Sequence, residues 1–341
     1  MTKLDPVIQI GSRRIGAGEP TYIIAEVGSN HNQSFDTARQ LIDAAVKTGV
    51  DAVKFQLFRA EALYPVGTEM HKLFKAHEMP PEWVEKLKRH AETQNVHFLA
   101  SAFDSPSVDL LDSVGVLSHK VASSEMTNIP LLSRIASARR PMILSTGMCD
   151  LVDVLEAVEV CSRAGNHSLV LLQCGSMYPL PPELVHLSVM DKFRSLFGCP
   201  VGLSDHTLTL TASLSAVARG ANVIEKHFTL DKKSKGPDHF YALEPNELKA
   251  LVEGIREVSV LIGTPQKDLL PKERELGRRE GLYASKTIPE GTILDLDQLQ
   301  VKRPAVGIRA RHLSSVVGMK AKGSIAKDSP IRWNDLTHEN K

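Results

Sequence analysis

The chain has 341 residues, of which 42% are hydrophobic and 24% charged, with a formal net charge of +1. This is the composition of an ordinary water-soluble globular protein with room for one large and one small domain. The 41 basic and 40 acidic residues are well mixed, which argues against a nucleic-acid-binding stripe or an acidic tail. No apolar run approaches the roughly 20 residues of a membrane span, and residues 1–6 lack the apolar core of a signal peptide. The four cysteines include no C-x-x-C pair, so we expect reduced thiols and a cytoplasmic protein.

Short apolar runs alternate with amphipathic segments along most of the chain. Eight runs have the length of buried strands: residues 22–27, 52–57, 97–102, 119–123, 141–145, 168–173, 200–207 and 222–229. The segments between most of them have helical spacing: residues 36–46, 82–93, 106–114, 129–138, 151–164, 208–219 and 245–262. Eight strand–helix units predict a parallel (β/α)8 barrel. A doubly wound open sheet is the alternative, but it usually has a glycine-rich phosphate turn after its first strand, and residues 26–31 do not form one.

Polar side chains recur at or just past the C-terminal half of nearly every predicted strand. They are Glu26, Lys54, Gln56, Ser101, Asp104, Lys120, Ser123, Glu125, Ser145, Thr146, Ser176, Tyr178, Ser204, His206, Glu225 and His227. In (β/α)8 enzymes the active site lies at this end of the strands. The pattern therefore predicts one site that is lined from all sides.

Two histidines end the last two predicted strands. Because side chains alternate along a strand, Ser204 and His206 share one face, and Glu225 and His227 share one face of the next run. If the strands are neighbours, both imidazoles point into the same space, where they could hold a catalytic divalent metal. A pair of hydrogen-bonded core histidines is the alternative.

Two lysines, Lys54 and Lys120, belong to different strands of the same predicted site. With the hydroxyls of Ser123, Ser145 and Ser204 nearby, they suit a substrate that carries phosphate or carboxylate. The alternative is that both lysines have a structural role in the core, with their ammonium groups hydrogen-bonded there, although lysine is rarely buried without a partner. A barrel lysine would also suit a Schiff-base aldolase.

The remaining candidates are acid/base groups and possible ligand contacts. Glu26, Glu125 and Asp238 are candidate proton-transfer groups, although Asp238 follows a Gly-Pro turn and could be a loop residue. Gln56 could hydrogen-bond a sugar hydroxyl or be one polar residue on a buried strand. Tyr178 could bind a ligand or fill the barrel rim. Arg303 could be exposed or reach a ligand from the small domain.

The alternation of predicted strands and helices ends at about residue 264. We predict a barrel domain over residues 1–264, an exposed linker over residues 265–282 and a small domain over residues 283–341. Short strands are expected at residues 284–288 and 299–304. A domain of about 60 residues is only marginally stable by itself, so we expect it to pack against another protein surface.

Seven motifs in order resemble the sialic acid synthase family. They are AEVGSNH at residues 25–31, VKFQ at 53–56, KVASSE at 120–125, LSTGM at 144–148, GLSDHT at 202–207, EKHFT at 225–229 and GPDH at 236–239. The C-terminal segment is similar to the antifreeze-like (SAF) domain of that family. The resemblance runs from about residue 23 to the end of the chain and covers both domains.

The resemblance implies condensation of phosphoenolpyruvate with the open-chain aldehyde of a mannosamine-type sugar, giving N-acetylneuraminate and phosphate from N-acetylmannosamine. It implies a divalent metal on His206 and His227, with manganese expected first and magnesium or cobalt as alternatives. Glu26 and Glu125 would transfer protons. The phosphoenolpyruvate site would comprise Lys54, Lys120, Ser123, Ser145, Ser176, Tyr178 and Ser204. Gln56, Ser101, Phe103, Glu125 and Asp238 would face the sugar.

The resemblance also implies a domain-swapped homodimer in which Arg303 enters the partner's barrel and touches the acyl group of the sugar. The chain departs from the family pattern at Ser176, at residues 101–102 and at residues 240–243, all near the expected sugar pocket. The sugar is therefore open between N-acetylmannosamine, a diacetamido deoxyhexose that leads to legionaminate-type or pseudaminate-type products, and a phosphorylated hexosamine. A sugar-binding or ice-binding protein without catalysis is the non-enzyme alternative.

Overall fold

A computed structural model of the protein describes residues 3–338. The chain divides into two compact units, one up to Gly263 and the other from Thr264 onward. Each unit has its own hydrophobic core.

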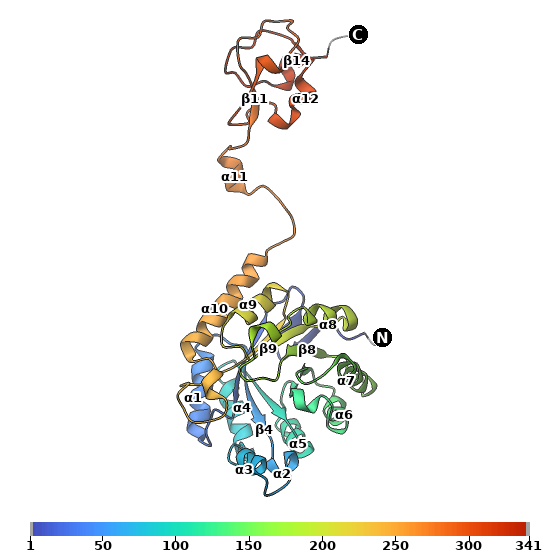
Figure 1. Ribbon diagram of the computed structural model, residues 1–341, viewed down its shortest axis with the longest axis vertical. Coiled ribbons are helices and arrows are strands. Elements are labelled where there is room, and N and C mark those ends of the chain that lie inside the picture. The colour runs from blue at the N-terminus through green and yellow to red at the C-terminus, as the bar shows by residue number, and fades with distance from the viewer. Residues whose placement is uncertain (1–2, 339–341) are drawn as a thin grey trace. The chain divides into compact units, whose positions relative to one another are not determined.

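Eight parallel strands close into a barrel in the first unit (Figure 1), in the order β10, β3, β4, β5, β6, β7, β8, β9. The strands are β3 (Tyr22–Gly28), β4 (Ala52–Leu57), β5 (His97–Ala102), β6 (His119–Val121), β7 (Met142–Ser145), β8 (Leu169–Cys174), β9 (Val201–Asp205) and β10 (Val223–His227). Each of the eight predicted runs overlaps one of these strands, with β3 and β8 each ending one residue later than predicted, and the (β/α)8 prediction is confirmed.

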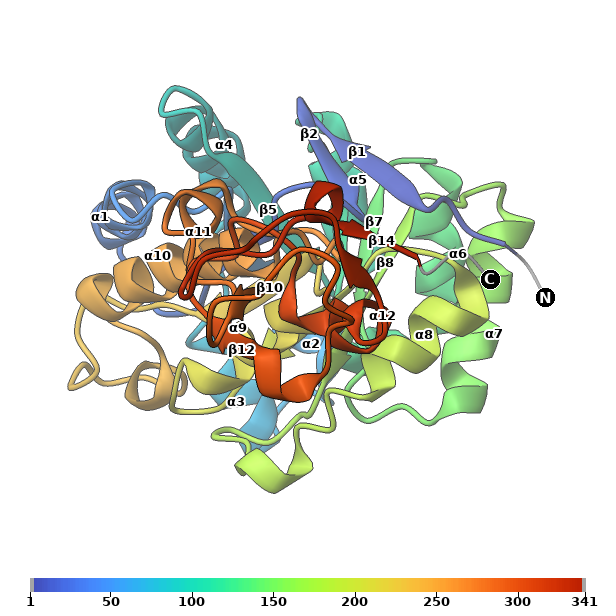
Figure 2. The same cartoon turned by 90° about the horizontal axis from the view of Figure 1, so that it is seen from above.

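Helices surround the strands (Figures 1 and 2). They are α1 (Phe35–Val46), α4 (Val84–Glu92), α5 (Ser105–Ser113), α6 (Ile129–Ser137), α7 (Leu151–Arg163), α8 (Val189–Phe197), α9 (Thr211–Ala218) and α10 (Pro245–Ile262). Several begin at a side-chain cap, as where Asp104 and Asp150 accept backbone N–H bonds, which satisfies amides that the helix leaves unpaired. None of the helices within residues 3–338 is long and apolar enough to cross a membrane.

Three helices of the first unit were not predicted from the sequence. Helix α8 begins after Ser188 without a side-chain cap hydrogen bond, although its buried residues Met190, Phe193 and Phe197 have helical spacing. Helices α2 (Ala60–Leu63) and α3 (Glu69–Lys75) belong to the segment after β4. Helix α3 has only seven residues and buries none of them, so its apolar residues Met70, Leu73 and Phe74 form a stripe of a single turn, which is a weak signal.

An apolar floor closes the lower part of the barrel. A hairpin that was not predicted, β1 (Val7–Ile10) with β2 (Arg13–Gly16), contributes Ile8, Ile10 and Ile15 to it. These side chains cluster with inward-facing strand residues such as Leu99 and Val170. The next inward-facing residues along the strands are polar, so the polar site lies directly above this apolar layer.

The outward faces of β9 and β10 carry a separate buried ion pair. Lys226 Nζ lies 3.0 Å from Asp205 Oδ2, and Ser213 donates a hydrogen bond of 2.6 Å to the same oxygen. Both charged residues point away from the barrel interior, as strand alternation requires. They join the strand ends to α9 and take no part in the site.

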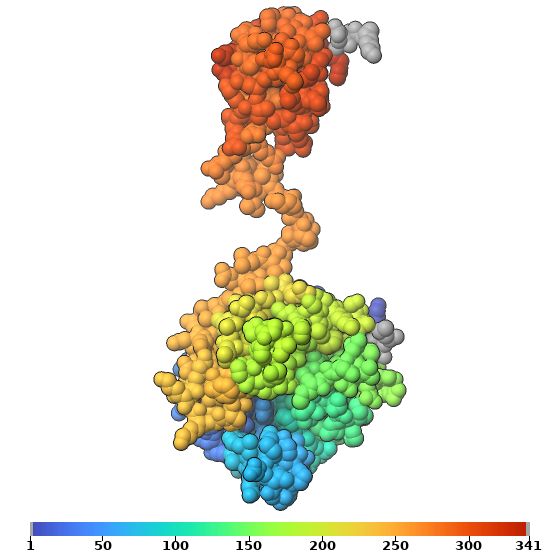
Figure 3. Space-filling view, in the orientation of Figure 1, coloured from blue at the N-terminus to red at the C-terminus, as the bar shows by residue number. Residues whose placement is uncertain are grey.

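The second unit is a small domain of short strands, seen as a packed body in orange to red in Figure 3. Its strands are β11 (Gly281–Ala284), β12 (Leu299–Lys302), β13 (Lys320–Ala321) and β14 (Leu336–Thr337). Its short helices are α11 (Pro271–Glu275) and α12 (Leu313–Val316). The strand expected at residues 284–288 is displaced, because only Ala284 belongs to β11, and Ile288 instead forms an isolated bridge with Ile325.

The tightest interior position is Gly202, on β9 beneath Ser204 and His206. A Cβ there would lie 2.1 Å from the carbonyl oxygen of Val223 and 2.7 Å from Leu172 Cδ2. We expect Gly202→Ala to lower the free energy of unfolding by at least about 1–3 kcal/mol, because overpacking displaces rigid backbone. Urea denaturation measures this. Gly323→Ala is the control, because nothing lies within 4 Å of its Cβ position; equal stabilities of the two variants would contradict the packing described here.

Candidate active site

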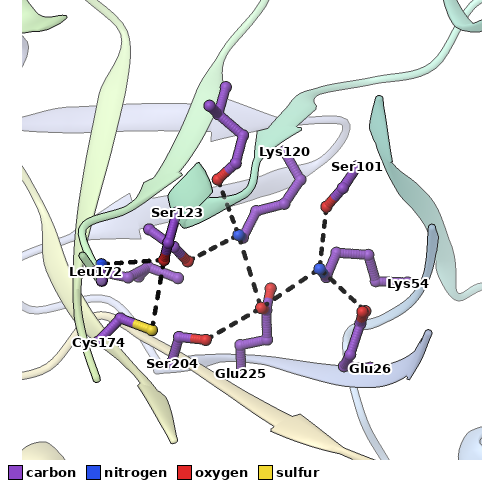
Figure 4. Close-up of polar contacts among 12 residues, drawn as sticks. Glu26, Lys54, Ser101, Lys120, Ser123, Leu172, Cys174, Ser204 and Glu225 are labelled. Carbon is purple, nitrogen blue, oxygen red and sulfur yellow. Dashed lines mark hydrogen bonds and ion pairs between the residues drawn. The ribbon is translucent and has the colours of Figure 1, made fainter. Parts of the chain in front are cut away.

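A buried carboxylate lies between two buried lysines at the C-terminal ends of the strands (Figure 4). Glu225 Oε1 on β10 is 3.4 Å from Lys54 Nζ on β4 and 3.7 Å from Lys120 Nζ on β6. Ser204, on the neighbouring strand β9, donates to the same oxygen at 3.2 Å. Side chains from four strands therefore meet near the middle of the barrel.

Each lysine has further partners on its other side. Lys54 contacts Glu26 Oε2 at 3.0 Å and donates to Ser101 Oγ at 3.1 Å. Lys120 donates to Ser145 Oγ at 2.8 Å and to the carbonyl oxygen of Val121 at 3.1 Å. Both ammonium groups are thus held in fixed positions with carboxylates and hydroxyls around them.

The charges in this group alter one another's ionisation. Burial opposes the charge of Lys54, but Glu225 and Glu26 raise its pKa above the ordinary value. Burial likewise opposes ionisation of Glu225, but Lys120 and Lys54 lower its pKa. For Glu26 burial prevails and raises the pKa to about 7. Glu225 is therefore the ionised counter-ion of the two lysines, and Glu26 can exchange a proton near neutrality.

A small polar recess adjoins Lys120. Ser123 Oγ accepts a hydrogen bond of 3.0 Å from the amide of Gly147 and lies 3.6 Å from Cys174 Sγ. Ser176 Oγ is buried and has no hydrogen-bond partner among residues 3–338. A Cβ on Gly147 would lie only 2.2 Å from this oxygen. Glycine at residue 147 therefore allows the hydroxyls of Ser176 and Ser123 to lie close against the backbone, where their O–H groups could donate to an anion.

The two predicted histidines lie side by side at the mouth of the barrel. The ring centroids of His206 and His227 are 5.3 Å apart. His206 Nδ1 donates to the carbonyl oxygen of Gly175 at 2.8 Å, which turns its Nε2 lone pair outward. Tyr178 packs on His206 with a centroid distance of 4.2 Å, and Tyr241 OH lies 3.4 Å from His227 Nδ1.

This donor set fits a loosely held divalent cation. Burial lowers the pKa of His227 well below its ordinary value, so its imidazole is neutral and free to bind a metal. The pKa of His206 is raised, because contacts with Cys174 outweigh burial, so a metal there would displace a proton. Within residues 3–338, no group of three or more His, Cys, Asp or Glu side chains could enclose a metal. Most coordination positions of such a cation would fall to water and substrate.

Two hollows open at this end of the barrel, and they share Gln56, Tyr178 and His227. The inner hollow has a polar lining of Glu26, Lys54, Gln56, Ser101, Lys120, Ala122, Ser123, Ser145, Cys174, Tyr178, Ser204, His206, Glu225 and His227. The outer hollow is lined by Ser29, Gln56, Phe58, Leu73, Phe74, His77, Tyr178, His227, Pro237, Asp238 and Tyr241. Most of the predicted site residues thus line one connected space.

Four predicted site residues do not line either hollow. Phe103 packs edge-on against Phe58, with centroids 5.8 Å apart. Glu125 accepts a hydrogen bond of 2.7 Å from Ser124, and burial raises its pKa to about 7. Ser176 has the unpartnered hydroxyl described above. Arg303 is exposed in the second unit, 3.1 Å from Glu280.

Other site residues were missed by the sequence prediction. Glu225 was among the polar residues predicted to line the site, on the same strand face as His227, but no catalytic or binding role was predicted for it. Cys174, Gly147 and Tyr241 carried no clear signal. The aromatic wall of the outer hollow comes from the segment after β4, where no element was predicted.

Comparisons with known proteins give the family. The NeuB family model matches residues 41–267, and the SAF domain model matches residues 279–337. The N,N'-diacetyllegionaminic acid synthase of Campylobacter jejuni is 39% identical, with 92% of this chain and 99% of that protein covered. The N-acetylneuraminate-9-phosphate synthase of Homo sapiens is 37% identical, with 94% and 93% covered.

A solved structure has the same fold. The N-acetylneuraminic acid (sialic acid) synthetase of Leptospira borgpetersenii, in complex with citrate, superposes with a TM-score of 0.76 at 32% identity. The match covers 81% of this chain and 96% of that one. The chain therefore belongs to the NeuB family of nonulosonic acid synthases and carries a C-terminal SAF domain.

Proposed function

We propose that the protein condenses phosphoenolpyruvate with the open-chain aldehyde of an N-acylated mannosamine-type sugar and releases inorganic phosphate. The observation that carries this proposal is the convergence of Lys54, Lys120, His206 and His227 on one buried space. Two fixed ammonium groups suit a small anion with two charged ends, and the histidines lie where a second reactant would enter.

Phosphoenolpyruvate would occupy the inner hollow. Its phosphate and carboxylate would take the place of part of the Glu225 contact with the lysines. The hydroxyls of Ser123, Ser145, Ser176, Ser204 and Tyr178 would supply further donors. Support comes from the unpartnered hydroxyl of Ser176, whose buried oxygen lacks a partner among the described residues.

The reaction forms one carbon–carbon bond and one carbon–oxygen bond, between C2 and the oxygen of water, and it breaks the C2–O bond to phosphate. The enol electron pair of phosphoenolpyruvate attacks the aldehyde carbon, and the aldehyde oxygen takes a proton. Water adds to the resulting cation at C2 and loses a proton. Phosphate then leaves with its bridging oxygen, which gives the keto acid. Glu26 and Glu125 are the proposed proton-transfer groups, supported by pKa values of about 7 for both.

A divalent metal would be held by His206 and His227, with manganese as our first choice and magnesium or cobalt as alternatives. When bound, such an ion polarises the aldehyde carbonyl as a Lewis acid. Gln56, Ser101, Phe103, Glu125 and Asp238 are the proposed residues for orienting the sugar. Gln56 already donates to Glu26 Oε1 at 3.1 Å.

The alternatives from the sequence fit the geometry less well. A Schiff-base aldolase needs an unprotonated lysine, whereas the carboxylates raise the pKa of Lys54. Burial lowers the pKa of Lys120, but its Nζ already donates to Ser145 and lies 3.7 Å from Glu225. A sugar-binding or ice-binding protein would have no use for buried lysines and carboxylates beneath its ligand. Trapping with borohydride would reveal an imine if the aldolase alternative were correct.

We further propose that the protein acts as a domain-swapped homodimer in which Arg303 from one copy touches the acyl group of the sugar in the other. The side chain of Arg303 is 63% exposed and, among residues 3–338, has one acidic partner, Glu280. A cytoplasmic location is proposed as well, supported by four unpaired cysteines, three of which are buried.

The first prediction concerns His227→Ala. We expect this variant to fold, to keep its affinity for phosphoenolpyruvate within about tenfold and to lose turnover by at least ~100-fold, because a positioned catalytic group is removed. Phosphate release with a panel of hexosamines measures turnover, and EDTA followed by Mn2+ should abolish and restore it in the wild type. Full turnover in the variant would remove the metal hypothesis.

The second prediction concerns Gly147→Ala. The added Cβ would lie 2.2 Å from Ser176 Oγ and 2.8 Å from Ser123 Oγ and would displace both hydroxyls, without backbone strain, since the glycine has no positive φ. We expect at least tenfold weaker binding of phosphoenolpyruvate, about the loss of one hydrogen bond to a charged group. Calorimetry measures the affinity, and Gly323→Ala is the matched control. Unchanged binding would show that the anion lies elsewhere.

The third prediction concerns Arg303→Ala. If Arg303 acts in the partner's barrel, the variant should have a sugar KM raised about tenfold, as expected for loss of a charged hydrogen bond. Mixing it with the His227→Ala variant should restore activity. In a mixed dimer, the barrel of the Arg303→Ala copy keeps His227 and receives Arg303 from the other copy, so one site is intact. Failure of the mixture to recover activity, with mixed dimers verified by mass spectrometry, would contradict the swapped arrangement.

A further inference from the structure

Two tyrosines pack against the paired imidazoles at the mouth of the barrel. Tyr178 packs on His206 with a centroid distance of 4.2 Å, and Tyr241 packs edge-on against His227 at 5.0 Å. Tyr178 is 47% exposed, whereas Tyr241 is only 3% exposed. A buried tyrosine hydroxyl usually has a hydrogen-bond partner, so the neighbours of the Tyr241 hydroxyl indicate what this side chain does.

Hydrogen bonds hold Tyr241 beside the strand that carries His227. Tyr241 ends a short 3-10 turn, η4 (His239–Tyr241). Just beyond this turn, Leu243 donates its backbone N–H to the carbonyl oxygen of His227 at 2.8 Å, and the N–H of Thr229 donates to the carbonyl oxygen of Leu243 at 2.9 Å. At the start of the turn, His239 Nδ1 pairs with Thr229 Oγ1 at 2.7 Å. Both ends of the turn are therefore fixed to the end of β10, and the phenol ring is fixed with them.

The hydroxyl of Tyr241 lies on the Nδ1 side of the His227 ring. The oxygen is 3.4 Å from Nδ1, whereas Asp238 Oδ2 is 3.9 Å from the same nitrogen, which is too far for a hydrogen bond. Asp238 interacts with the tyrosine instead: burial raises the pKa of Asp238, and a hydrogen bond with Tyr241 opposes that rise. Tyr241 thus connects the carboxylate of Asp238 with the imidazole of His227.

The direction of these hydrogen bonds decides which nitrogen of His227 can bind a metal. A tyrosine hydroxyl has one proton to donate and lone pairs that accept. If Tyr241 donates to Asp238, it can accept from Nδ1–H of His227, and the Nε2 lone pair stays free. If it donated to Nδ1 instead, Nε2 would carry the ring proton and could not bind a cation. An ionised carboxylate is a stronger acceptor than a neutral imidazole, so Asp238 favours the first arrangement.

The other histidine of the pair has a comparable partner. His206 Nδ1 donates to the carbonyl oxygen of Gly175 at 2.8 Å, which leaves its Nε2 lone pair free. Histidines that bind metals usually have such an acceptor on the second ring nitrogen, and its removal lowers metal affinity about 10- to 100-fold. The 3.4 Å contact of Tyr241 is longer than the 2.8 Å contact of Gly175, so we expect an effect at the lower end of this range.

We propose that Tyr241 is a positioning residue for the divalent metal and acts through His227. Its hydroxyl accepts the Nδ1 proton, donates its own proton to Asp238 and so presents Nε2 of His227 to the cation. This inference rests on the proposed function, since the metal comes from it. Tyr241 also lines the outer hollow, so a direct contact with the sugar is the alternative role that the experiment has to separate from this one.

The test is Tyr241→Phe, which keeps the ring and removes the hydroxyl. We expect its Kd for Mn2+, measured without substrates by electron paramagnetic resonance of the free ion, to rise at least about tenfold. The Kd for phosphoenolpyruvate should stay within about twofold, and kcat and the sugar KM should return to within about threefold of the wild type at saturating Mn2+. Tyr64→Phe is the matched control, since Tyr64 packs on Phe74 at 4.8 Å and lines neither hollow; its Kd for Mn2+ should be that of the wild type.

The outcomes separate this inference from the proposed function. If the wild type binds none of Mn2+, Mg2+ and Co2+, the metal of the proposed function is wrong and the inference is wrong with it. If the wild type binds Mn2+ and Tyr241→Phe binds it equally well, the proposed function stands and the inference is overturned. A raised sugar KM with unchanged Mn2+ affinity is that same result and assigns Tyr241 to the sugar. Weaker binding of both Mn2+ and phosphoenolpyruvate, with a lowered Tm, would also overturn it, because the role would then be structural.

Discussion

The carboxylate of Glu225 between the ammonium groups of Lys54 and Lys120 is the contact on which the site depends. All three residues are at most 5% exposed, and a buried charge without a partner costs several kcal/mol. The closed ring of strands fixes the three groups at distances at which they neutralise one another. An incoming dianion would meet two cations already in position, so little reorganisation precedes binding.

The layers of the barrel explain why these charges can remain buried and still meet a substrate. The hairpin β1–β2 and the inward residues of the lower strands make an apolar floor, which keeps water from beneath the lysines. Above them the wall changes from polar to aromatic, from the inner hollow to the outer one. A small anion and a larger, less polar molecule would thus enter one mouth at different depths.

Strand periodicity made much of this site predictable. The alternation of side chains along a strand placed His206 with Ser204, and His227 with Glu225, on inward faces. The parallel barrel brought the C-terminal ends of these strands together. Spacing along the chain does not encode which lysine meets which carboxylate, so the position of Glu225 between two cations could not be derived. Helix α3 lacks a buried face, and its residues Leu73 and Phe74 reach the outer hollow from a connecting segment; a single turn of apolar spacing is too short to indicate such a wall.

The most direct measurement of the central claim is the affinity of phosphoenolpyruvate for Lys120→Met, determined by calorimetry alongside the wild type. Methionine keeps most of the length of the side chain and removes its charge, while Lys54 still neutralises Glu225. If the two ammonium groups form one anion site, the dissociation constant rises by about 10- to 100-fold, as expected for a charged hydrogen bond. An unchanged dissociation constant in a folded variant would contradict the account.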